Sequence, residues 1–273
     1  MFKIPTFLKK LFGSEHPISD SALGVKTESL STVGLYYPKT NTLMIRNPKS
    51  DGISIVYNID FPGDMLRPVS GKWLTSQPAS IALFDVERSV FLFRQKFTDG
   101  KPEGLIPFGD PSRYSVPLAG DWDGDGISGI GIFNSEKRTF HLKNTAVAGL
   151  ADYIFAFGRA NQGLIPIAGD WNGDGKDTVG LYDPVTAEFM LKNSLSGGAA
   201  DIKFQVKNKP SMSLPLAGDW LGNGRDSVGI YDLTNGSFRL IDDLNYPDNT
   251  KEFSFGPSGQ ICIPFSLKWH SEH

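Results

Sequence analysis

The sequence predicts an all-β fold assembled from repeats, and three observations support this. The chain of 273 residues contains 30 glycines, 18 prolines and 19 phenylalanines, a composition that favours short strands joined by tight turns. Its five tryptophans lie 49 residues apart. Apolar residues alternate within each repeat at the period of a strand with one buried face. Four short strands in a repeat of about 50 residues are typical of a propeller blade. We therefore expect a five-bladed β-propeller with four-stranded blades.

The predicted first strand of each blade leads into a tryptophan. Residues 117–122, 166–171 and 215–220 share the pattern Pro-x-Ala-Gly-Asp-Trp, and weaker copies end at Trp73 and Trp269. A large aromatic residue at the same place in every repeat suits packing between blades. We interpret the tryptophans as core residues, with sugar stacking as the alternative.

The other three strands follow each tryptophan at constant spacing. The predicted second strand ends on a recurring aromatic residue (Tyr36, Phe84, Phe133, Tyr182 and Tyr231). The third strand carries an apolar residue seven positions later (Leu43, Phe91, Phe140, Phe189 and Phe238) and another two positions beyond it (Ile45, Phe93, Leu142, Leu191 and Leu240). The fourth strand is predicted to end at Phe108, Phe157, Val206 and Phe255.

The two ends of the chain complement each other. Residues 33–61 supply a second, third and fourth strand without a first strand, and residues 263–269 supply a first strand without the other three. We expect the C-terminal strand to complete the N-terminal blade, because this pairing removes two open sheet edges. Residues 18–273 are therefore predicted to form a single propeller domain.

Residues 1–17 differ from the repeats and are predicted to be a short amphipathic helix or a disordered lead. Phe7, Leu8, Leu11 and Phe12 fall at helical spacing, and a weak contact with a membrane surface or a partner is the alternative. The segment lacks the uninterrupted apolar stretch of a secretory signal, so the compartment stays unassigned. No apolar run in the sequence approaches the roughly 18 residues of a transmembrane helix, and we expect no transmembrane segment.

Charge and cysteine content narrow the classes of partner. The net charge is −3 and both signs are spread along the chain, which argues against a nucleic-acid partner because such a surface needs a basic face. The only cysteine, Cys262, lies in an apolar run and is predicted to be buried.

An acidic, glycine-rich loop follows the first strand in three blades. Counting from the residue before the tryptophan, oxygen-bearing side chains occupy positions 1, 3 and 5 in blades three and four (Asp121, Asp123 and Asp125; Asp170, Asn172 and Asp174). Such oxygens suit a hard cation, and glycines allow the positive φ angles of a tight wrap. We predict one or two calcium ions. Blade five has Leu221 at position 3 and loses a ligand. The alternative is a metal-free turn whose acids accept backbone N–H bonds.

These loops resemble a known family. Ala-Gly-Asp-Trp-x-Gly-x-Gly followed by Val-Gly-x-Tyr is similar to the FG-GAP/VCBS-type repeats of integrin α-subunit propellers and many bacterial surface proteins. The resemblance implies calcium in the loops between first and second strands, which would suit an extracellular setting. The chain also departs from the family pattern. Lys72 and Lys268 stand at position 1 in two blades, and the acids expected at position 9 are replaced by Asp177 and Asp226 one residue earlier.

Two classes of function remain open. The four histidines form no metal motif, and no nucleophile elbow or phosphate loop is present. We expect a non-catalytic, lectin-like or adhesion-like module that binds a carbohydrate or a protein. The alternative is an enzyme with a site at the propeller axis or against a partner. Charged side chains that converge at the axis with shifted pKa values would favour the enzyme, whereas shallow aromatic sites between blades would favour a lectin.

Overall fold

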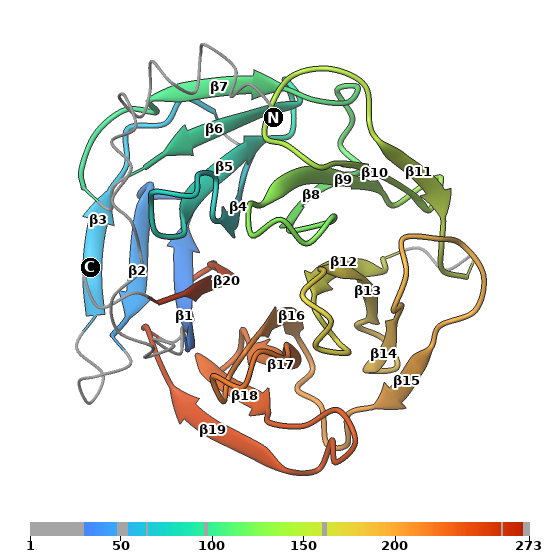
Figure 1. Cartoon of the computed structure of the whole chain (residues 1–273). Coiled ribbons are helices and arrows are strands. Elements are labelled where there is room, and N and C mark those ends of the chain that lie inside the picture. The colour runs from blue at the N-terminus through green and yellow to red at the C-terminus, as the bar shows by residue number, and fades with distance from the viewer. Residues whose placement is uncertain are drawn as a thin grey trace, which may run out of the picture.

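The computed structural model describes residues 30–47, 54–63, 65–95, 98–159, 163–257 and 259–269, so the prediction for residues 1–17 lies outside it. The described residues form twenty strands in five antiparallel four-stranded sheets, arranged as a ring (Figure 1). The predicted five-bladed β-propeller is confirmed. No helix capable of crossing a membrane occurs in the described ranges.

Each blade has its strands in the predicted order from the axis outwards. Blade one contains β20 (Ile263–Lys268), β1 (Ser31–Tyr37), β2 (Thr42–Arg46) and β3 (Ser54–Asn58); blade two contains β4 (Leu66–Gly71), β5 (Ser80–Asp85), β6 (Val90–Arg94) and β7 (Gly104–Pro107); blade three contains β8 (Ser115–Gly120), β9 (Gly129–Asn134), β10 (Thr139–Lys143) and β11 (Tyr153–Ala156); blade four contains β12 (Ile165–Gly169), β13 (Thr178–Asp183), β14 (Glu188–Leu191) and β15 (Ile202–Gln205); blade five contains β16 (Ser213–Gly218), β17 (Ser227–Asp232), β18 (Ser237–Ile241) and β19 (Thr250–Ser254).

The ring closes through its first blade. β20 pairs antiparallel with β1, with Ser31 opposite Lys268 and Tyr36 opposite Ile263. The Trp269 N–H continues the pairing by donating to the Leu30 carbonyl at 3.0 Å. The predicted closure is confirmed, and the C-terminal strand leaves β1 without an open edge.

The fourth strands end one residue earlier than the sequence pattern predicts. The predicted last residue follows the strand, and its N–H donates to a residue in the hairpin between the second and third strands. Phe157, for example, bonds to the Arg138 carbonyl at 3.0 Å, and Val206 bonds to the Ala187 carbonyl at 2.9 Å. Both acceptor residues have φ of 58°. The third strand has already entered the hairpin turn at these acceptor residues. The ladder of paired residues therefore stops before the apolar residue at which the sequence pattern ended the fourth strand.

The core lies between blades. Each of five apolar clusters combines a face of one blade with the facing second strand of the next. Trp171, for example, is 2% exposed and packs in a cluster with Val228 and Ile230 of blade five. The tryptophans are therefore packing residues, as predicted, and their faces are not available for sugar stacking. Cys262 is buried as predicted, with its Sγ 3.4 Å from the Tyr231 hydroxyl.

Candidate functional site

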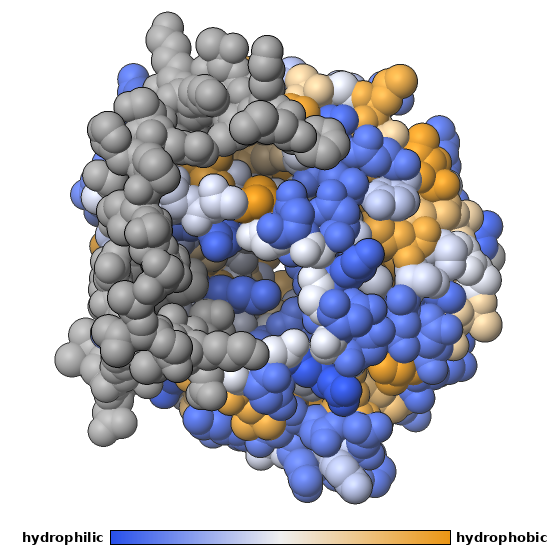
Figure 2. All heavy atoms as spheres, viewed as in Figure 1, coloured by the Kyte–Doolittle hydropathy of each residue, from blue (hydrophilic) through white to orange (hydrophobic). Residues whose placement is uncertain are grey.

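A pocket lies on the ring axis where the first strands end. The inner strands β4, β8, β12, β16 and β20 surround the axis, and the residues that follow them form one end of it. The cavity has a volume of about 240 Å³. Figure 2 shows the hollow at the centre of the ring, with hydrophilic residues at its rim. We call this cavity the axial pocket.

Charged side chains of both signs line the axial pocket, on different blades. Lys268 comes from blade one and Lys72 from blade two. Asp121, Asp177 and Asp226 come from blades three, four and five. Within the described residues, neither lysine nitrogen has a carboxylate oxygen within 4.0 Å, the limit for an ion pair. The pocket therefore has a cationic side and an anionic side that are not joined by ion pairs.

The two acids that stand one residue before position 9 join neighbouring blades. The Asp177 N–H donates to the Asp121 carbonyl at 2.8 Å, and the Asp121 N–H donates back to Asp177 Oδ2 at 2.7 Å. Asp226 makes the same pair of bonds with Asp170, at 2.8 and 2.9 Å. The sequence pattern showed that these acids stand one residue away from the expected position. It did not predict their hydrogen-bond partners, because each partner lies 56 residues away in the sequence.

Serines take the place of these acids between blades two and three and between blades five and one. The Ser128 hydroxyl accepts from the Lys72 N–H at 2.9 Å, and the Ser31 hydroxyl accepts from the Asp219 N–H at 3.0 Å. Ala79 lines the pocket with Lys268 and has no side-chain acceptor. The interface between blades one and two therefore lacks the bond that a side chain provides at the other four.

Burial and charge shift the titration of the pocket residues. Burial raises the pKa of the Asp177 carboxyl, and the neighbouring Asp226 carboxylate raises it further. Burial also raises the pKa of Asp226, although Lys268 opposes the rise. For Lys268, burial acts to lower the pKa, but the attraction of Asp226 and Asp177 outweighs it and raises the pKa. Lys268 is therefore cationic at neutral pH.

The blade-three loop brings its three predicted ligands together. Carboxylate oxygens of Asp121, Asp123 and Asp125 lie within 4.8 Å of one another. Calcium binds oxygens at about 2.3–2.6 Å, so two ligands of one ion lie within about 5 Å of each other. Asp121 also closes the loop: Oδ1 accepts from the Gly124 and Asp125 N–H groups, and Oδ2 accepts from the Gly126 N–H. Burial raises the pKa of Asp121, while these N–H donors oppose the rise. An oxygen has two lone pairs, so Oδ2, which accepts one N–H, keeps acceptor capacity for a cation.

The loops of blades four and five repeat this backbone with fewer carboxylates. Asp170 accepts the same three N–H bonds in its loop, and the Asn172 amide donates to Asp174 Oδ2 at 2.9 Å. Gly175 has φ of 86°, and no atom lies within 4 Å of the place where a side chain would begin, so the backbone angle and not crowding favours glycine there. In blade five, Leu221 stands at position 3 and is 53% exposed. The predicted ligand sets are therefore brought together in blade three and partly in blade four.

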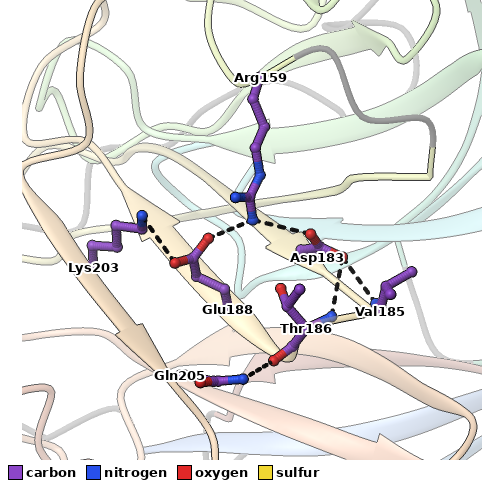
Figure 3. Close-up of polar contacts among 7 residues, drawn as sticks. All are labelled: Arg159, Asp183, Val185, Thr186, Glu188, Lys203 and Gln205. Atoms are coloured by element: carbon purple, nitrogen blue, oxygen red, sulfur yellow. Dashed lines mark hydrogen bonds and ion pairs between the residues drawn. The ribbon is translucent and has the colours of Figure 1, made fainter.

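A second group of paired charges lies where the segment after β11 meets blade four (Figure 3). Arg159 donates to Asp183 Oδ2 at 3.0 Å and to Glu188 Oε2 at 2.5 Å, and Lys203 lies 3.0 Å from Glu188 Oε1. Burial acts to raise the pKa of Asp183, but backbone N–H donors of Val185 and Thr186 and the Arg159 charge lower it overall. These charges satisfy one another, so the group connects the segment after β11 to the blade-four hairpin and offers no open site.

Charges at the axis and aromatic sites between blades are the two features that distinguish an enzyme from a lectin. Charged side chains converge at the axis, and several have shifted pKa values. Among the described residues, ten large apolar side chains are exposed, and only one of them, Tyr246 at 64% exposure, is aromatic. The tryptophans between blades are buried in the clusters, and Phe155, Phe204 and Phe253 pack against the clusters while partly buried. The feature expected for an enzyme is therefore present at the axis, and the pocket there is the best-formed candidate site.

Comparison with known proteins gives few matches. No family model and no curated protein matches the chain. One aligned structure is the crystal structure of BBS1N in complex with ARL6DN, soaked with mercury, with 9% identity and a TM-score of 0.40 over 80% of this chain and 63% of that one. Another is an Agrocybe aegerita lectin that specifically recognises non-reducing terminal N-acetylglucosamine, with 12% identity and a TM-score of 0.42 over 82% of this chain and 65% of that one. The chain spans less than two thirds of the length of either.

Proposed function

We propose that this chain is a non-catalytic, lectin-like or adhesion-like binding module whose ligand contacts the end of the ring formed by the acidic loops. One observation carries the proposal. Oxygens of Asp121, Asp123 and Asp125 lie within 4.8 Å of one another in a loop that borders the axial pocket. An exposed group of oxygens beside a polar hollow suits a partner that is recognised through its own oxygens.

Calcium in the loops of blades three and four is part of this proposal. Asp121, Asp123 and Asp125 would hold one ion, and Asp170, Asn172 and Asp174 would hold a second. Calcium takes six to eight oxygen ligands, so three side chains leave positions for the hydroxyls of a carbohydrate or the carboxylate of a protein. The resemblance of the loops to FG-GAP/VCBS-type repeats supports the same assignment.

A glycan array and an array of acidic peptides, each probed in calcium and in chelator, test the proposal. We expect binding on one of the arrays in calcium and its loss in chelator. The matched variants are Asp125→Ala and Asn223→Ala, because Asp125 Oδ1 accepts the Ile127 N–H and Asn223 Oδ1 accepts the Arg225 N–H. Both variants lose this turn bond, but only the first loses a carboxylate from the blade-three group. Binding that persists in chelator and in Asp125→Ala would contradict the calcium-supported module.

An enzyme at the axis is the second candidate, and one observation favours it. Burial and the neighbouring Asp226 carboxylate raise the pKa of Asp177, and a raised pKa suits a carboxyl that acts as an acid. A nucleophile with its base is not formed among the pocket serines. The hydroxyls of Ser31 and Ser128 bond to backbone N–H groups, and neither bonds to a carboxylate. Analysis of reaction products, with any ligand that the arrays identify, decides between the binding module and the enzyme. Turnover of that ligand that disappears in Asp177→Asn would establish the enzyme.

A further inference from the structure

We propose that the axial pocket binds a small zwitterionic molecule, with its cationic group against Asp177 and Asp226 and its anionic group against Lys72 and Lys268. This site goes beyond the proposed function, because it requires neither calcium nor the partner that contacts the acidic loops. The proposal rests on the presence of both charges in the pocket lining, on the unused capacity of these charged groups and on the size of the pocket.

The anionic side has oxygens to spare. Asp177 and Asp226 each use Oδ2 to accept a backbone N–H from the preceding blade. Their Oδ1 atoms have no hydrogen-bond partner among the described residues, although both side chains line the cavity. Asp226 is only 6% exposed. A carboxylate that is poorly hydrated gains from a cationic donor, since a charge-assisted hydrogen bond replaces the water that burial removes.

The cationic side results from a substitution at position 1. In blades three to five an aspartate stands there, and its carboxylate is turned to the N–H groups of its own loop. Lysine cannot accept these bonds, because an ammonium group is a donor only. Lys72 and Lys268 instead line the axial pocket, and neither forms an ion pair with a described residue. Two unpaired ammonium groups on neighbouring blades suit a carboxylate or a phosphate.

The volume limits the ligand to a small molecule. A cavity of about 240 Å³ corresponds to roughly eight water molecules at about 30 Å³ each. It lies below the range of about 300–1,000 Å³ that holds drug-sized ligands. A molecule with a single charge would leave the opposite side of the pocket unpaired, so a compound with both charges at its two ends fits the lining best.

Calorimetry with ω-amino acids of increasing chain length, from glycine to aminohexanoate, tests the proposal in chelator-containing buffer. These compounds keep both charges and vary only their separation. We expect one chain length to bind best, and to bind about tenfold more tightly than the carboxylate or the amine of the same length, because each of these lacks one charged contact. The chelator keeps the result independent of the calcium loops, so failure here and failure of the proposed function are distinguishable.

Two pocket variants and one control locate the site. Lys268→Met and Asp226→Asn should each weaken binding by about tenfold, since each removes one charge from the lining. Lys137→Met should bind as the wild type does, because Lys137 is exposed in the hairpin between β9 and β10. Thermal melting checks that each variant is folded, and Asp177→Asn replaces Asp226→Asn if the latter is not. The proposal is wrong if no compound in the series binds, if the singly charged analogues bind equally well, or if a folded Lys268→Met variant keeps full affinity.

Discussion

The residue at position 1 of each loop performs two tasks with two different groups. Its backbone N–H is accepted by a side chain of the next blade at four of the five interfaces. An aspartate side chain there closes the loop, as those of Asp121 and Asp170 do, whereas the lysine side chains of Lys72 and Lys268 line the axial pocket. The main-chain task is compatible with either residue, so the charge of the pocket can change from blade to blade without loss of the link between blades.

The link between blades predicts a difference between two variants of Asp177. Asp177→Ser should keep an acceptor for the Asp121 N–H, as Ser128 does for Lys72 at the equivalent place. Asp177→Ala removes the acceptor and leaves a buried donor. We expect the alanine variant to be about 1–3 kcal/mol less stable than the serine variant. Urea denaturation measures this difference, and equal free energies of unfolding would show that the bond contributes nothing.

The acidic loops of blades three, four and five share one backbone conformation but carry three different sets of ligand residues. Gly124, Gly173 and Gly222 have φ of 80°, 76° and 69°, so all three loops turn in the same way. The number of carboxylates at positions 1, 3 and 5 falls from three in blade three to two in blade four and one in blade five. A graded response to calcium follows if these loops bind it.

Melting in calcium and in chelator tests this gradation. Calcium that binds only the folded loops should raise the melting temperature by mass action. Asp123→Ala should remove most of that increase, Asn172→Ala part of it and Asn223→Ala little, because they remove a carboxylate, an amide and a residue of an incomplete set. Identical wild-type curves with and without calcium would identify the loops as metal-free turns.

The blade-five loop offers a test by gain of a ligand. Leu221 is 53% exposed, so a polar residue should be tolerated there. Leu221→Asp would place a carboxylate at position 3, between Asp219 and Asn223. We expect a larger calcium-dependent rise in melting temperature than in the wild type. In chelator, the free energy of unfolding should differ from that of the wild type by no more than about 0.5 kcal/mol. Calcium titration by calorimetry should show one additional site, and an unchanged number of sites would mean that the backbone alone does not prepare the loop.

At the scale of the whole molecule, stability depends on closure of the ring. β20 is the inner strand of blade one, and it also contacts β16 and β4 of the two neighbouring blades. Phe265, Leu267 and Trp269 belong to the apolar cluster between blades one and two. The C-terminal strand therefore connects sheets at both ends of the chain, and its loss affects two interfaces together.

A chain that ends before Gln260 should lose cooperative unfolding. The truncation removes β20, opens the edge of β1 and exposes the cluster between blades one and two. A chain that ends at Trp269 is the matched control and should melt as the full chain does. Circular dichroism melting compares the two. A cooperative transition in the shorter chain near the temperature of the control would contradict the dependence on closure.

Strands and closure could be predicted from the sequence because their signals are local and repeated. The spacing of Trp122, Trp171 and Trp220 sets the repeat, and the alternation around Phe189 and Leu191 marks a strand whose pairing lies within the same blade. The fourth-strand ends were predicted one residue too late, because apolar patterning continues past the last paired residue into the core. Position 1 and its loop could likewise be found from the repeat, although whether the loop binds calcium stays a prediction.

The axial pocket was decided only by the tertiary structure. Asp177 and Asp226 occupy the same place in two repeats, but no local pattern relates them to Lys268. Closure places Lys268 of the last strand between blades five and two and in one pocket with Lys72 and with the acids of blades four and five. The sequence alone determined the repeat, the number of blades and the way in which the ring closes, because each depends on spacing along the chain. Which side chains meet at the axis depends on the ring itself, since contacts between residues from separate blades exist only when all five sheets are in place.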